Sequence, residues 1–175
     1  MKTLKKIILA SIILLFTISC KKDDLPKATQ TGSNNIAAKI NGKVWQRKGC
    51  FGCIGGGSGI SINYDDQTFF GISAQNRDLK YTVTLIIENL KSKTTCTLGN
   101  GIGNNKATNY AKVSSDFTNY INYYTTEGLI GKVTITKLDT TNKIVAGTFE
   151  FIAENENDPN DVITLTDGWF DVKYI

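Results

Sequence analysis

The chain has 175 residues, 41% of them hydrophobic, with 20 lysines and arginines against 16 acids and no histidine. This length suits one globular domain. The lack of histidine removes the commonest general base, the Ser-His and Cys-His nucleophile pairs, and the usual ligand of zinc, copper and haem. The composition therefore excludes much ordinary enzymology and names no molecular activity.

Residues 1–19 have the pattern of a signal peptide. A start with three lysines precedes an almost wholly apolar stretch over residues 7–18. That stretch is shorter than the roughly 20 residues of a membrane-spanning helix, so we expect it to be cleaved. Thr17-Ile18-Ser19-Cys20 resembles the bacterial lipobox, although Thr17 stands where Leu, Val or Ile is usual. The resemblance implies that Cys20 is acylated, and two or more acyl chains give stable membrane attachment.

The residues after Cys20 resemble a second targeting signal. Lys21-Lys22-Asp23-Asp24 resembles the surface-export signal of Bacteroidota lipoproteins, in which a lysine and two acids follow the cysteine. The resemblance implies a protein anchored on the outer face of the outer membrane, in an oxidising compartment. The alternative is a solvated charge run within a linker. Residues 20–35 are polar, and we expect a flexible tether that spans roughly 20 Å on average.

The positive charge of the chain lies in its targeting segment and tether. After removal of residues 1–19, 17 lysines and arginines face 16 acids, and residues 36–175 alone carry 14 of each. The domain is therefore neutral, with no electrostatic footprint for nucleic acid.

Residues 36–175 read as β structure throughout, because short runs rich in Thr, Val, Ile and Tyr alternate with polar turns. We expect an all-β domain, a single antiparallel β-sandwich or flattened barrel of about nine to eleven strands. Residues 94–126 are the least regular part of the pattern. The clearest strands are expected, in chain order, at 36–40, 43–45, 59–64, 68–75, 81–88, 132–138, 145–153, 162–166 and 169–174.

Three polar stretches are expected to separate strands. Asn41-Gly42 predicts a tight hairpin, because both residues tolerate positive φ. Asp167-Gly168 is expected to split the last two strands. The acidic, asparagine-rich residues 154–161 read as a solvated loop with a turn at Pro159, and a weak calcium site is the alternative.

The end of the chain carries a further resemblance. Gly147-Thr148-Phe149-Glu150-Phe151-Ile152-Ala153 and the later Thr166-Asp167-Gly168-Trp169-Phe170-Asp171-Val172-Lys173-Tyr174 are similar to the ending of a family of small Bacteroidota outer-membrane lipoproteins of unknown function. That family also begins its domain with Asn-Gly and a nearby tryptophan, as do Asn41, Gly42 and Trp45. The resemblance implies an all-β lipoprotein domain and no activity.

Cys50-Phe51-Gly52-Cys53 is the most conspicuous motif. A redox pair would open a helix, but the glycine-rich residues 55–59 cannot sustain one. A zinc site would need a carboxylate, because Cys20 is acylated and only Cys96 remains as a third thiol. We expect a Cys50–Cys53 disulfide, with a bridge to Cys96 or free thiols as alternatives, and we expect no metal or other cofactor.

Tyrosines and asparagines alternate over residues 119–124. Aromatic rings can pack on the apolar faces of a sugar or peptide while neighbouring amides form hydrogen bonds to it. The pattern is therefore typical of a surface that binds a sugar or a peptide. Tyr120, Tyr123 and Tyr124 are therefore candidate ligand-binding residues, although the same pattern fits a strand with Ile121 and Tyr123 buried.

These patterns favour a surface-exposed lipoprotein that binds a glycan, a peptide or a partner protein without catalysis. Two alternatives from other classes stay open. One is a histidine-free hydrolase, which requires two acids in a concave cluster with shifted pKa values. The other is a thiol-disulfide exchange protein that uses Cys50 and Cys53. No catalytic residue is nominated, and the oligomeric state is not predicted.

Overall fold

The computed structural model describes residues 24–49, 57–65, 69–102, 107–115, 120–129 and 131–175. The regular structure in these residues is β, and they contain no helix long and apolar enough to cross a membrane. The eleven strands are β1 (Asn35–Ile40), β2 (Lys43–Gln46), β3 (Ile60–Asp65), β4 (Phe69–Asn76), β5 (Tyr81–Glu88), β6 (Thr95–Thr97), β7 (Asn109–Ser115), β8 (Ile121–Tyr124), β9 (Gly131–Asp139), β10 (Ile144–Asn155) and β11 (Asp158–Lys173).

The strands form one antiparallel sheet that is not closed into a barrel. Its hydrogen-bonded path runs β2-β1-β11-β10-β8-β7-β5-β4-β3, while β9 pairs with β10 and β6 pairs with β9. Most of β10 pairs with β9, but Glu154 and Asn155 at its end pair with β8 instead. The sheet therefore branches at β10. The expected all-β fold of about nine to eleven antiparallel strands is confirmed.

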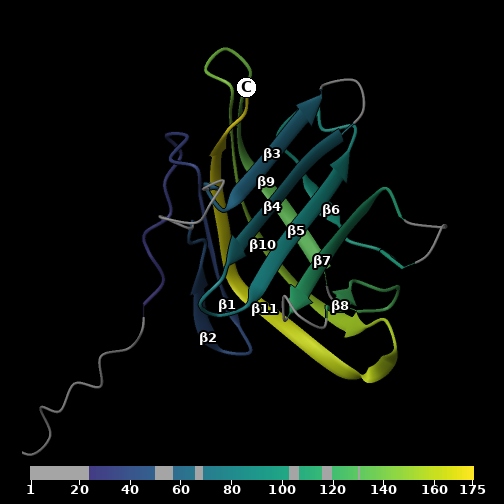
Figure 1. The fold of residues 1–175 in the computed structure, drawn as a ribbon. Helices are drawn as coiled ribbons and strands as arrows, with labels where there is room; N and C mark the ends of the chain where they lie inside the picture. Colours follow the sequence, from purple (N-terminus) through teal and green to yellow (C-terminus); the bar gives the residue numbers. More distant parts are fainter. Residues whose placement is uncertain (1–23, 50–56, 66–68, 103–106, 116–119, 130) are drawn as a thin grey trace, which may run out of the picture.

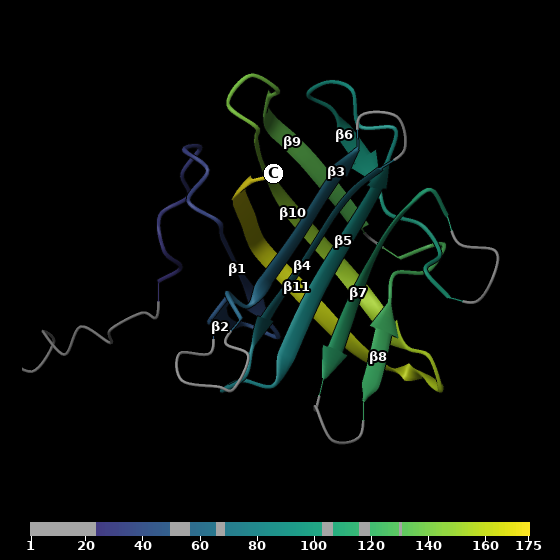
Figure 2. The same cartoon turned by 45° about the horizontal axis from the view of Figure 1, so that its top comes forward.

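The sheet doubles back on itself into two crossing layers. Figure 1 shows β3, β4, β5 and β7 in front of β9, β10 and β11, and Figure 2 shows β8 beside β7 where the layers join. Rings meet between the layers: the centroids of Phe70 and Phe170 are 5.7 Å apart, and those of Tyr64 and Tyr174 are 4.7 Å apart. Full burial of one such side chain stabilises the fold by about 1.5–3 kcal/mol.

Several strands follow directly from local sequence. β5 spans the expected residues, and its alternation places Val83, Leu85 and Ile87 in the core at 0% exposure. The expected hairpin between β1 and β2 is also present, with φ values of 48° at Asn41 and 78° at Gly42. Positive φ at both central residues is the conformation that Asn-Gly tolerates best.

The expected break at Asp167-Gly168 is wrong, because β11 runs without interruption from Asp158 to Lys173. Phe149 pairs with Gly168 and Phe151 with Leu165, so β11 holds an extra residue in a bulge. Asp167 has a φ of 54°. Asp-Gly serves a bulge for the same reason that it serves a turn, since both need a residue at positive φ.

The acidic stretch is also more ordered than expected. β10 ends at Asn155 and β11 begins at Asp158, so the turn is formed by Glu156 and Asn157. Pro159 lies within β11 rather than at the turn. β1 pairs with β11 only as far as Leu165, so β1 does not lie beside Pro159. The backbone N–H that proline lacks is therefore not needed for pairing with β1.

The last part of the expected flexible tether contacts the domain. Residues 29–34, here named the strap, lie against β11, where the carboxylate of Asp171 is 0% exposed. Its Oδ1 accepts a hydrogen bond from the backbone N–H of Gly32 at 2.7 Å. Its Oδ2 accepts hydrogen bonds from Thr29 Oγ1 at 2.6 Å, Thr31 N at 2.9 Å, Ser33 Oγ at 2.9 Å and Ser33 N at 3.1 Å.

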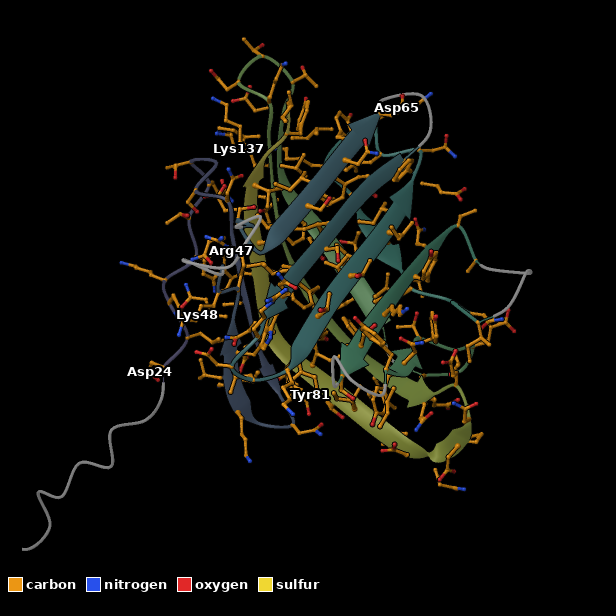
Figure 3. All side chains as sticks on the ribbon, in the orientation of Figure 1. Asp24, Arg47, Lys48, Asp65, Tyr81 and Lys137 are labelled. Carbon is orange, nitrogen blue, oxygen red and sulfur yellow. The ribbon has the colours of Figure 1, made fainter. Side chains whose placement is uncertain are left out.

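Further bonds hold both ends of the strap. The N–H of Lys173 donates to Asn34 Oδ1 at 2.7 Å, and Lys137 Nζ donates to the carbonyl of Gln30 at 3.0 Å. Figure 3 labels Lys137 beside the strap and Asp24 at the outer end of the described segment. Any flexible part of the tether therefore ends before Thr29.

Candidate ligand-binding cavity

A cavity of about 380 Å³ opens at one end of the two layers, and we name it the mouth cavity. Its walls come from the β1–β2 hairpin and from the turn that joins β4 to β5. Its volume lies within the roughly 300–1,000 Å³ of ligand pockets. The lining residues are Ile40, Asn41, Lys43, Val44, Trp45, Asp78, Leu79, Lys80 and Tyr81.

Asn76 joins the two walls. Its Nδ2 donates to the carbonyl of Gln46 at 2.7 Å, and its Oδ1 accepts from the N–H of Leu79 at 3.0 Å. Next to it, the N–H of Lys48 donates to the carbonyl of Gln75 at 3.0 Å, and the Lys48 ammonium pairs with the Asp78 carboxylate. These bonds fix the hairpin to the β4–β5 turn, so the cavity is preformed.

The floor of the mouth cavity is apolar and aromatic. Trp45 is 1% exposed, and within the described part of the chain its buried indole N–H has no hydrogen-bond partner. Such an unpaired donor costs about 1–3 kcal/mol. Tyr81 shares the inward face of β5 with the core residues and lies at the open end of the front layer (Figure 3). Leu79, in the β4–β5 turn, is 46% exposed and also lines the cavity.

The rim of the mouth cavity is positively charged. Lys43 and Lys80 are both exposed. Asp78, the only acid among the described lining residues, is already neutralised by Lys48. Among the residues that the structure describes, no carboxylate forms an ion pair with Lys43 or Lys80. The rim therefore attracts an anion, while the floor favours an apolar group.

The three candidate tyrosines have different surroundings. Tyr120 is 65% exposed, and Tyr123 is 9% exposed. Burial, followed by a 2.9 Å hydrogen bond to Asp161 Oδ2 and the charge of that carboxylate, raises the pKa of Tyr123 to about 12. Tyr124 is half-buried beneath the Lys112 ammonium, which lies 5.2 Å from the ring centroid. Tyr123 is thus a core residue, and the three rings do not form one continuous surface.

The cysteine predictions fall largely outside the described residues, since Cys20, Cys50 and Cys53 all lie there. Cys96 is a free thiol in β6, half-buried against the core. Burial raises the pKa of this thiol, which lowers its thiolate fraction and its reactivity.

Acidic residues gather in one further hollow. Glu150 and Asp167 line the same cavity on the outer side of β10 and β11. Glu150 pairs with Lys132 at 2.9 Å, and Asp167 pairs with Lys39 at 2.7 Å, so each carboxylate is already neutralised. In the described part of the chain, no group of three or more cysteines and acids is arranged to hold a metal ion.

Sequence reasoning missed the mouth cavity, because its two walls lie far apart in the chain and only the fold brings them together. One signal was present in Leu79, a large apolar residue among the charged residues of a turn. Exposed apolar side chains are typical of a binding surface where several of them lie together.

The model of a domain of unknown function, DUF6252, matches residues 56–172. This chain belongs to the DUF6252 family. No curated protein and no solved structure matches the chain. The expectation of an uncharacterised family is therefore confirmed.

The DUF6252 match includes only one wall of the mouth cavity. The β4–β5 turn with Leu79 and Tyr81 lies inside the matched region, whereas the hairpin with Lys43 and Trp45 precedes it. The strap also precedes the matched region, although Asp171, which holds it, lies inside. The folded unit of this protein thus extends beyond the DUF6252 region toward the N-terminus.

Proposed function

We propose that this DUF6252 protein is a non-enzymatic binding module, anchored by acylated Cys20 on the outer face of the outer membrane. Its mouth cavity takes a ligand that combines an apolar body with one carboxylate, as an apolar residue at the C-terminus of a peptide does. The mouth cavity carries this proposal through its aromatic floor of Trp45 and Tyr81 and the ammonium groups of Lys43 and Lys80, which form no ion pair with any described residue.

The charged rim and the apolar floor together favour this ligand class over a neutral glycan or a wholly apolar ligand. A neutral glycan would leave both lysines without a partner. A wholly apolar ligand would bring its body close to two ammonium groups with nothing to offset their desolvation. A carboxylate on an apolar group satisfies the rim and the floor together, and the preformed walls reduce the ordering cost of binding.

Lys43 and Lys80 at the rim are expected to bind the carboxylate of the ligand. With the purified full chain, a short peptide that ends in leucine with a free carboxylate is expected to bind about two- to thirtyfold more tightly than its C-terminal amide, because two exposed charge contacts contribute about 0.2–1 kcal/mol each. Lys43→Gln with Lys80→Gln is expected to remove that preference. Isothermal titration calorimetry measures both affinities.

A matched control uses Lys91→Gln with Lys93→Gln, which removes two exposed lysines from the segment between β5 and β6. This control should keep the wild-type preference for the free acid. Octanoate tests whether the carboxylate comes from a lipid instead of a peptide. Equal affinity of the acid and the amide for the wild-type chain would contradict the proposed chemistry.

The anchor has its own test. The lipobox-like residues before Cys20 and the Lys-Asp-Asp sequence after it support surface anchoring. Cys20→Ser is expected to move the protein from the membrane fraction to the soluble fraction, because the acyl chains supply the attachment. Protease added to intact cells should degrade the wild-type domain. A domain that is cleaved in lysates and untouched on intact cells would disprove the surface location.

A further inference from the structure

The hollow lined by Glu150 and Asp167 is a second cavity, of about 330 Å³, on the outer face of the rear layer beside the strap. We name it the strap cavity. Ala28, the residue before the strap, forms one wall, and side chains of β9, β10 and β11 form the others. The lining residues are Ala28, Lys132, Thr134, Thr148, Phe149, Glu150, Asp167, Gly168 and Trp169.

Trp169 is the unusual member of this set. It lies between Gly168 and Phe170 in β11 and pairs with Thr148 across β10, on the sheet face opposite the core residue Phe170. Trp169 is 6% exposed, yet its buried indole N–H has no hydrogen-bond partner among the residues that the structure describes. A tryptophan on an outer face with an unused donor is costly unless a ligand uses it.

The strap gives the cavity a permanent wall. The Asp171 carboxylate lies two residues after Trp169 on the same face and holds the strap through its bonds to Gly32 and Ser33. Ala28 is only one residue from Thr29, whose hydroxyl donates to Asp171 at 2.6 Å. The wall at Ala28 is therefore held in place before any ligand arrives.

The polar groups of the strap cavity balance in charge. Lys132 pairs with Glu150 at 2.9 Å, and Asp167 pairs with Lys39 at 2.7 Å. Thr134 and Thr148 lie opposite each other on β9 and β10 and add two hydroxyl groups. Together these side chains offer both donors and acceptors without net charge, and the indole adds an apolar surface. Such a mixture suits a ligand that carries many hydroxyl groups around an apolar ring face.

We propose that the strap cavity binds a neutral saccharide of one or two sugar residues, independently of the mouth cavity. An apolar edge of the sugar packs against the small part of Trp169 that borders the cavity. Its hydroxyl groups exchange hydrogen bonds with Thr134, Thr148 and the two ion pairs. A hydroxyl oxygen seated at the indole edge accepts the hydrogen bond that Trp169 lacks.

The test uses the purified full chain with lactose, cellobiose and chitobiose as probes, followed by saturation-transfer NMR and titration. Thr148→Arg places a long side chain in the cavity from an exposed strand position and is expected to weaken binding by at least about tenfold. Thr141→Arg is the matched control, because Thr141 is an exposed threonine in the turn between β9 and β10 and does not line the cavity. It should bind as the wild type does.

Trp169→Phe provides a second measurement, since it keeps an aromatic ring and removes the N–H donor. Its sugar affinity is expected to fall several-fold, with the urea midpoint used to confirm that the chain is folded. Binding of none of the three sugars would overturn the proposal, as would wild-type affinity in Thr148→Arg. Lys43→Gln with Lys80→Gln should leave sugar binding unchanged, so failure of this site and failure of the mouth cavity are distinguishable.

Discussion

Asp171→Asn is expected to lower the free energy of unfolding by about 2–3 kcal/mol, because hydrogen bonds to a charged group are worth about 1.5–3 kcal/mol and an amide replaces one acceptor oxygen with a donor. The buried carboxylate accepts from Thr29, Thr31, Gly32 and Ser33, so the substitution leaves several of these donors unpaired. Urea denaturation measures the loss, and amide exchange at Gly32 and Ser33 locates it in the strap.

The pH dependence of stability separates the charge of Asp171 from its shape. Burial alone would raise the pKa of this carboxyl, but the bonds from Thr29, Gly32, Ser33 and Thr31 outweigh it and lower the pKa from 3.8 to about 2. At acid pH the unfolded chain takes up this proton first, so the stabilisation is present above about pH 4 and is lost as pH falls toward about 2. A shift of this size corresponds to about 2 kcal/mol.

The wild-type chain should therefore lose stability between about pH 4 and pH 2, and Asp171→Asn should lose less over the same range. Asp158→Asn is the matched control, because this carboxylate on the same strand also accepts a backbone N–H, from Asn160 at 3.0 Å, but is exposed. It should retain the wild-type acid profile. An unchanged acid profile in Asp171→Asn would show that the strap does not depend on the charge.

The role of Asp171 was not visible in the sequence. Within β11 it occupies a position that alternates with the core residues Phe170 and Val172, and an acid at such a position is normally solvated. What buries it is a segment about 140 residues earlier in the chain, with the sequence Thr-Gln-Thr-Gly-Ser. That segment is polar and lacks apolar periodicity, which also describes a flexible tether. Only the fold distinguishes a donor-rich strap from a linker.

Features that depend on neighbouring residues were predicted well, and features that depend on distant partners were not. The alternation of β5 and the Asn-Gly hairpin between β1 and β2 each follow from a few adjacent residues. The mouth cavity joins Trp45 to Tyr81, and the strap cavity joins Ala28 to Trp169, so neither has a local signature. Each cavity is lined by a tryptophan, Trp45 in one and Trp169 in the other. The sequence does not show that the indole N–H groups of both lack a partner among the described residues.

The bulge at Asp167-Gly168 lies between these two cases and leads to the second large effect. The dipeptide signals positive φ but does not say whether the strands separate or continue. In the structure they continue, and Phe149 packs directly onto Gly168. A Cβ at Gly168 would lie 2.6 Å from the carbonyl oxygen of Phe149 and 2.6 Å from its ring.

Gly168→Ala is expected to lower the free energy of unfolding by about 3 kcal/mol, near the upper end of the usual cost of overpacking. The backbone carbonyl cannot rotate away as a side chain can, and Gly168 is not among the residues at positive φ, so the cost is steric. Gly57→Ala is the control, because the nearest atom to its Cβ would be 3.9 Å away. It should leave stability unchanged or raise it by up to about 1 kcal/mol.

A double substitution tests the contact itself. Phe149→Leu shortens the side chain that faces Gly168, and alone it is expected to cost about 1–2 kcal/mol through the cavity it leaves. If the ring and the new methyl group compete for the same space, Gly168→Ala with Phe149→Leu should cost less than the sum of the two single changes. Simple additivity would place the strain at the Phe149 carbonyl rather than at its ring. An effect of Gly168→Ala no larger than that of Gly57→Ala would show that the bulge does not require glycine.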